Sequence, residues 1–158
     1  MEYKRQCEKF QPVFRHYFTE NLCNPTEWYR QKCNYMYSLT TSSIVGHIVA
    51  QVDRHLQNIL INKATSELIH IDLGVAFDQG QQLHIPESEK VPFRLTRDLV
   101  DVLGISGTVG VLRRSCEHAM RVLQENKELL ITIMEVLIHD PLFNWYINDT
   151  TTETKKLL

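Results

Sequence analysis

The sequence predicts a mostly helical α+β fold that contains one small β-hairpin. Several stretches carry apolar residues at three- and four-residue steps, which is the periodicity of a helix with one buried face. Two short apolar runs, residues 58–62 and 68–71, are separated by the mostly polar stretch 63–67, and this pattern is typical of a hairpin. A chain of 158 residues is long enough for one domain or part of one.

The helix predictions rest on apolar spacing and on capping residues. Residues 3–20 have helical spacing with a weak point at Pro12, because proline has no amide hydrogen to donate. Asn24 and Pro25 form a typical helix start, so a helix is expected from there to about Tyr37. Further helices are expected at residues 40–53, 97–103, 109–126 and 128–138.

The glycine-rich stretch 104–110 is expected to be a turn between two of these helices. Its glycines do not have the spacing of a dinucleotide-binding loop, and no lysine follows them as in a P-loop. The stretch therefore predicts no phosphate-binding site.

Composition and charge argue against several classes of protein. The chain is 43% hydrophobic and 23% charged, as soluble domains are, and no run approaches the roughly 20 apolar residues that span a bilayer. A net charge of −2 predicts neither a direct nucleic-acid site nor attraction to an anionic membrane. The four cysteines are scattered, so we expect reduced thiols and no zinc site.

The residues with the clearest chemical pattern lie around the predicted hairpin. The interval from Asp53 to Asn58 is the one that separates, in the protein-kinase catalytic loop, the Asp that orients the substrate hydroxyl from the Asn that holds magnesium. Asp72, Leu73 and Gly74 then follow in the manner of the kinase Asp-Phe-Gly metal site. The hairpin would bring Asn58 and Asp72 together, and their oxygen atoms are donors that Mg²⁺ prefers.

The order Asp53-Arg54-His55, where ordinary protein kinases have His-Arg-Asp, makes this stretch resemble the phosphatidylinositol-3-kinase-related protein kinases. The similarity to the ATM-type branch of this family covers nearly the whole chain, from about Tyr3 to Trp145. The segments that carry it are Phe10–Phe14, Thr41–Gly46, Gln57–Ile61, His70–Phe77, Val91–Asp98 and Asp140–Phe143.

The resemblance implies a fold and a set of site residues. It implies that residues 1–158 form the C-terminal lobe of a kinase catalytic domain, with a catalytic loop at 50–58 and an activation segment at 72–97. Asp53 would orient the substrate hydroxyl and His55 would face the transferring phosphate. The metal ligands would be Asn58 and Asp72, and the activation segment would include Asp72, Leu73, Gly74, Pro92, Phe93 and Arg94.

The resemblance also implies an activity and a cellular role. The activity would be transfer of the ATP γ-phosphate to a Ser or Thr followed by Gln in protein substrates, with ATP and Mg²⁺, or Mn²⁺ in its place. The expected role is in the DNA-damage response and DNA repair, with DNA-damage sensor proteins as partners. The expected location is the nucleus, with the cytoplasm as the alternative. Arg54 is expected to be structural and paired with a carboxylate.

Two departures from the family pattern lower the activity expected of the isolated chain. The family has Gly-x-Gly before the catalytic Asp, whereas this sequence has Ala50-Gln51-Val52. If either outer position has a positive φ, its side chain costs roughly 1–2 kcal/mol, and β-branched Val52 is the worse case. The Gly-rich loop and Lys of the kinase N-lobe and the C-terminal FATC motif are also absent, so we expect little or no activity from this chain alone.

Two other functions stay open at this point. A degenerate C-lobe without catalysis could act as an interaction module that binds partners through its helices. A lipid kinase would share the Asp-Arg-His order, but the activation segment lacks the basic cluster expected for phosphoinositide headgroups, with Lys90 and Arg94 as scattered cations.

Overall fold

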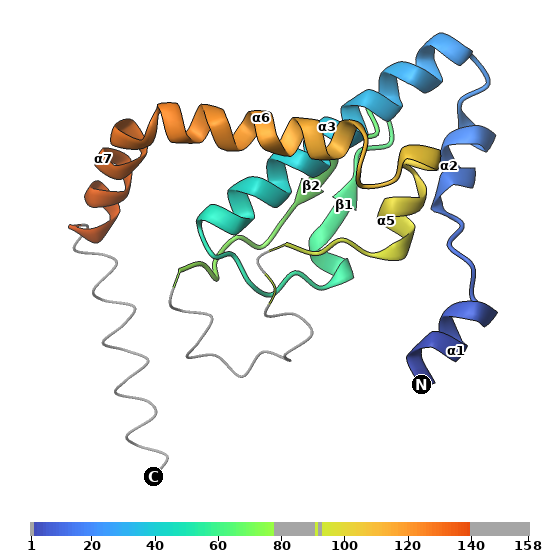
Figure 1. Cartoon of the computed structure of the whole chain (residues 1–158), viewed down its shortest axis with the longest axis horizontal. Helices are drawn as coiled ribbons and strands as arrows, with labels where there is room; N and C mark the ends of the chain where they lie inside the picture. The colour runs from blue at the N-terminus through green and yellow to red at the C-terminus, as the bar shows by residue number, and fades with distance from the viewer. Residues whose placement is uncertain (1, 78–90, 92, 140–158) are drawn as a thin grey trace. The chain divides into compact units, whose positions relative to one another are not determined.

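A computed structural model of the chain describes residues 2–77, 91 and 93–139, and it confirms a mostly helical fold with one small sheet (Figure 1). The chain divides into two units, residues 1–119 and 120–158. The described elements are α1 (Glu2–Lys9), α2 (Phe14–Asn21), α3 (Pro25–Ile48), η1 (Leu56–Asn58), β1 (Ile59–Ile61), β2 (Leu68–His70), α5 (Arg97–Asp101), η2 (Gly104–Ser106), α6 (Val111–Glu125) and α7 (Lys127–Ile138).

The break predicted at Pro12 separates α1 from α2. Val13, at the start of α2, provides no side-chain cap of its own. Two carboxylates of α5 replace it, since Asp98 accepts a hydrogen bond from the Val13 amide at 3.0 Å and Asp101 accepts one from the Arg15 amide at 3.0 Å. These bonds satisfy amides that the first helical turn leaves without partners, and they join α2 to α5, which lie side by side in Figure 1.

Helix α3 begins as predicted but is longer than predicted. The side chain of Asn24 accepts hydrogen bonds from the Thr26 and Glu27 amides at 2.9 and 3.3 Å, with Pro25 in the first turn. The expected end near Tyr37 and new start at residues 40–43 are wrong, because α3 runs without interruption to Ile48, and the expected end at Asp53 is wrong because the helix ends at Ile48.

Hydroxyl groups explain why α3 continues where an end was predicted. Thr40 and Thr41 donate to the carbonyls one turn back, at Met36 and Tyr37, over 2.8 and 2.9 Å. Ser and Thr hydroxyls can either cap a new helix or bond back within an existing one. Here they bond back, so the helix is not interrupted.

The predicted hairpin is confirmed. Strands β1 and β2 pair antiparallel with Ile59 opposite His70 and Ile61 opposite Leu68. In the turn, the side chain of Asn62 accepts from the amides of Ala64 and Thr65. Strand β2 also packs against α3, and the Leu68 amide donates to the Ser38 hydroxyl at 2.8 Å. The sheet is therefore fixed to the long helix.

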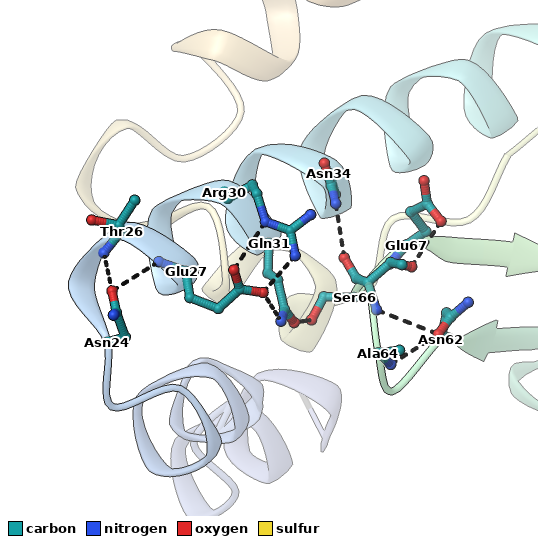
Figure 2. A network of polar contacts seen from close by, with 11 residues as sticks. Asn24, Thr26, Glu27, Arg30, Gln31, Asn34, Asn62, Ala64, Ser66 and Glu67 are labelled. Carbon is teal, nitrogen blue, oxygen red and sulfur yellow. Dashed lines mark hydrogen bonds and ion pairs between the residues drawn. The ribbon is translucent and has the colours of Figure 1, made fainter.

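A polar network joins the hairpin turn to the first half of α3 (Figure 2). The buried hydroxyl of Ser66 donates to Gln31 at 2.5 Å, and Gln31 in turn donates to Glu27 at 2.6 Å. Asn34 donates to the Thr65 carbonyl at 3.1 Å. Because these polar groups have partners, their burial does not carry the cost of unsatisfied donors and acceptors. The network sets the position of the turn on the helix.

The hydrophobic core of the first unit lies between α2, α3, β2 and the segment after residue 95. At its centre Tyr35 is fully buried, and its hydroxyl donates to the Leu99 carbonyl at 2.9 Å. Burial raises the pKa of Tyr35, so the phenol remains a neutral donor. The buried core residues are Phe18, Tyr35, Met36, Leu39, Leu68, Leu99, Val102, Leu103 and Leu112.

The later helices form near their predicted positions, but α5 is shorter than predicted and α6 spans Val111–Glu125 and not 109–126. The side chain of Thr96 accepts from the Leu99 amide at 3.3 Å and so starts α5, which ends at Asp101, before the expected Leu103. The glycine-rich stretch connects α5 to α6 as expected, and Gly104 has a φ of 74°, a value that L-residues with side chains rarely adopt.

Candidate active site

The predicted catalytic loop lies between α3 and β1, and its backbone pairs with the segment that follows Asp72. The Val52 amide donates to the Val75 carbonyl at 3.3 Å, and the Phe77 amide donates to the Val49 carbonyl at 2.8 Å. The start of the predicted activation segment is thereby held beside the catalytic loop.

Asp53 and His55 lie close together at a surface. The distance from His55 Nε2 to Asp53 Oδ1 is 4.0 Å, and their side chains are 33% and 26% exposed. Asp53 has a φ of 61°, in the left-handed region that Asp and Asn tolerate better than most residues. Both side chains are therefore accessible to a substrate in solution.

Asn58 and the residue before Asp72 are hydrogen-bonded through the backbone. The Ile71 amide donates to the Asn58 carbonyl at 3.0 Å, which extends the β1–β2 pairing by one step. The Asn58 side chain is buried, and its Nδ2 donates to the Asp53 carbonyl at 3.1 Å. Since a carbonyl can only accept, the amide nitrogen must face Asp53, and the amide oxygen lies on the other side.

The chemistry of these donors fits Mg²⁺. Asp72 is exposed and has a φ of 53°, and together with the Asn58 amide oxygen it offers two hard oxygen donors. Mg²⁺ usually takes one or two protein oxygens and completes its octahedron with waters and phosphate oxygens. Among the described residues there is no group of three or more His, Cys, Asp or Glu side chains that could hold a metal ion, so a site here would depend on those other ligands.

Arg54 is structural, as expected, but its partners are backbone carbonyls. It is 1% exposed, and its guanidinium donates to the carbonyls of Val52 at 3.1 Å, Ile71 at 2.8 Å and Asp72. Burial lowers the pKa of Arg54, while the charges of Asp53 and Asp72 act in the opposite direction. Sequence reasoning missed this arrangement because carbonyl acceptors have no signature in the sequence.

Only part of the predicted activation segment is described. Leu73 and Gly74 are exposed. At the far end, the Phe93 ring lies edge-on to the His47 ring of α3 at 6.4 Å, and Arg94 donates to the Arg54 carbonyl at 3.2 Å. Pro92 lies outside the described residues, as do residues 78–90.

Ala50 and Val52 stand where the family has glycine before Asp53, and Ala50 has a structural cost. Ala50 has a φ of 47°, whereas Val52 is not among the described residues with positive φ. The condition for strain is therefore met at Ala50 and not at Val52. The left-handed conformation costs an alanine about 1–2 kcal/mol, whereas glycine adopts it freely.

We expect Ala50→Gly to stabilise the chain by about 1 kcal/mol, because it removes this strain at some cost in unfolded-state entropy. That gain corresponds to a melting temperature higher by roughly 2–4 °C. Thermal unfolding followed by circular dichroism measures it. Ala64→Gly in the exposed hairpin turn is the matched control, since Ala64 is not among the described residues with positive φ, and no gain is expected there.

Stability is expected to fall in two steps as the pH is lowered. Burial and the nearby Arg54 charge lower the pKa of His70, and hydrogen bonds from Arg30 and Gln31 lower the pKa of Glu27 to about 2. A group with a lowered folded pKa contributes stability above its unfolded pKa and loses it as the pH falls through the folded value. The His70 step therefore begins below about pH 6.5 and the Glu27 step below about pH 4.5. In unfolding free energies measured against pH, His70→Gln should lack the first step. Glu27→Gln should show a smaller second step, because Glu117, whose pKa the hydrogen bond from Arg113 also lowers, contributes in the same pH range.

Solved structures with the same fold identify the class of protein to which the chain belongs. The fold matches a solved structure, "FAT and kinase domain of CtTel1", with a TM-score of 0.83 and 45% identity over 90% of this chain and 10% of that one. A second, "Tel1 kinase butterfly symmetric dimer", matches with a TM-score of 0.77 and 46% identity over 84% of this chain and 6% of that one. The fold is that of the catalytic region of phosphatidylinositol-3-kinase-like kinases.

Sequence comparison gives the family. The profile of the family described as phosphatidylinositol 3- and 4-kinase matches residues 1–147, and the chain belongs to this family. It is 54% identical over 142 residues to the serine-protein kinase ATM of Sus scrofa and 51% identical over 140 residues to the serine/threonine-protein kinase TEL1 of Candida albicans. These alignments cover 90% and 89% of this chain, and 5% of each relative. The ATM-type resemblance found in the motifs is thereby confirmed, for a chain that spans a small part of the relatives' length.

No helix in residues 2–77, 91 and 93–139 has both the length and the hydropathy of a membrane-crossing segment.

Proposed function

We propose that this chain is the C-terminal lobe of the catalytic domain of an ATM- and Tel1-like serine/threonine protein kinase. The catalytic loop would be residues 50–58 and the activation segment residues 72–97. The observation that carries the proposal is the pairing of the hairpin, in which the Ile71 amide bonds to the Asn58 carbonyl and so brings Asp72 to the end of the catalytic loop.

Each proposed role depends on what the side chain can reach. Asp53 orients the attacking hydroxyl of the substrate, since its carboxylate is partly exposed and can accept that hydrogen bond. His55 lies within 4.0 Å of the same carboxylate and is a donor for the transferring phosphate. The Asn58 amide oxygen and the Asp72 carboxylate hold Mg²⁺, which, when bound with ATP, neutralises the charge on the phosphate oxygens.

The names of the relatives describe them as serine- or serine/threonine-protein kinases, which supports protein substrates for this chain. We propose protein substrates in which Gln follows the Ser or Thr, ATP as the phosphate donor, and a nuclear role in the DNA-damage response with damage-sensor proteins as partners.

The test is phosphate transfer by the full natural polypeptide that carries this sequence. It should label a Ser-Gln peptide from γ-labelled ATP when Mg²⁺ is present, and it should label the matched Ser-Ala peptide far less. Phosphatidylinositol vesicles are the second substrate. Transfer to lipid but not to peptide would make the protein a lipid kinase, and no transfer to either would favour the non-catalytic interaction module.

A further inference from the structure

Arg54 joins two segments that contribute different parts of the candidate site. Its Nε bonds to the Val52 carbonyl in the catalytic loop, and its Nη1 and Nη2 bond to the carbonyls of Ile71 and Asp72. A guanidinium is planar and presents its donors in a fixed fork. The three carbonyl oxygens are thereby held at fixed positions relative to one another, which a flexible single-point ammonium would not achieve.

The charge of Arg54 is placed so that the nearby carboxylates remain available. Within the described part of the chain, no hydrogen bond or ion pair joins Arg54 to the side chain of Asp53 or Asp72, although both charges act on it. A buried cation is costly unless it is compensated. Here the backbone carbonyls supply the hydrogen bonds, and the two carboxylates supply the opposite charge without using their oxygens.

The far end of the activation segment is also hydrogen-bonded to Arg54, through the Arg54 backbone. Arg94 donates to the Arg54 carbonyl at 3.2 Å. The neighbouring residue, Phe93, contacts the His47 ring of α3. We infer that Arg54 is a positioning residue that sets the location of the Asp72 backbone relative to the catalytic loop. Its hydrogen bonds to the carbonyls of Val52, Ile71 and Asp72 form a clamp. Arg94 couples the far end of the activation segment to this clamp. The effect of the clamp on metal affinity rests on the proposed function, whereas the clamp itself rests on the hydrogen bonds of Arg54 alone.

The first test measures the clamp without any activity. In the full natural polypeptide, Arg54→Lys should accelerate hydrogen–deuterium exchange in segments 49–54 and 71–77, which contain the bonded amides of Ile71, Val52 and Phe77. An acceleration of at least about tenfold is expected from the loss of charge-assisted hydrogen bonds. Arg94→Leu should accelerate the same two segments by a smaller factor.

The matched control is Arg97→Lys. Arg97 is the last residue of the proposed activation segment, but the two carbonyls to which it donates, those of Phe10 and Cys7, both at 3.0 Å, belong neither to the catalytic loop nor to the hairpin. Its effect on exchange should be confined to the region of residues 7–13. Exchange in Arg54→Lys that is unchanged, or that rises equally in α3 and the core, would overturn the clamp.

The second readout connects the clamp to the metal. Arg54→Lys should raise the Mg²⁺ concentration that gives half-maximal peptide phosphorylation by at least about tenfold, with a smaller fall in turnover at saturating Mg²⁺. A variant that only lost folded protein would lower turnover and leave the Mg²⁺ dependence unchanged, which would overturn the link to Asp72. If the wild-type polypeptide transfers no phosphate, the proposed function and this metal link both fail, while the exchange result still decides the clamp.

Discussion

Replacing Asp53 by asparagine is expected to lower the turnover of peptide phosphorylation by about a hundred- to ten-thousandfold, the range usual for a group that handles the proton in the transition state. The φ of Asp53 is 61°, and asparagine is among the residues that tolerate this conformation best. The substitution therefore removes the charge and keeps the backbone of the loop. Turnover is measured with γ-labelled ATP and a Ser-Gln peptide in the full natural polypeptide, and thermal unfolding is measured beside it.

The control for this experiment is Asp101→Asn. Asp101 is likewise a carboxylate, but it accepts a hydrogen bond from the Arg15 amide at the start of α2 and is remote from the catalytic loop in sequence and contacts. Loss of the Asp101 charge should reduce stability by removing the ion pair with Arg15, and it should leave turnover near the wild-type value. If Asp53→Asn keeps most of its turnover while its melting temperature is unchanged, Asp53 does not orient the hydroxyl.

The parts of the fold that were predictable from sequence depend on local chemistry. Asn24 and Pro25 determine a helix start through their own side chains, and the structure has that start. The hairpin was predictable because two apolar runs of strand length flank a short loop, whereas its register, with Ile59 opposite His70, was not predicted. The candidate site residues were named from the same local pattern, and the pairing of the Ile71 amide with the Asn58 carbonyl brings Asp72 next to Asn58 in the chain trace; their roles stay predictions.

The parts that were not predictable depend on choices made by tertiary contacts. The hydroxyls of Thr40 and Thr41 can cap a new helix or bond back to the old one, and the burial of Thr40 and Leu39 in the core selects the second. Arg54 has backbone carbonyls as its partners, and no residue type encodes a carbonyl. The sequence shows that Ala50 stands where the family has glycine, but the positive φ of Ala50 can be seen only in the structure.

Phe18→Ala is expected to lower the free energy of unfolding by about 3–5 kcal/mol, the usual cost of removing a buried phenylalanine. Phe18 is 2% exposed and its ring packs edge-on against Phe14, Tyr17 and Tyr35 at centroid distances of 5.8, 5.4 and 5.5 Å. A small side chain leaves a cavity that this rigid aromatic cluster cannot close. Urea unfolding of the 158-residue chain, followed by circular dichroism, measures the loss.

Phe10→Ala makes the same chemical change at a position that is 72% exposed, so it should alter stability by less than about 0.5 kcal/mol. Natural domains have only about 5–15 kcal/mol of stability in total, so the loss at Phe18 is a large share of that total. The ring cluster also contacts Tyr35, whose hydroxyl bonds to the Leu99 carbonyl, and this places α5 against α3. Equal losses at Phe18 and Phe10 would mean that burial does not cause the effect, and that the aromatic cluster is not what holds α2 on the core.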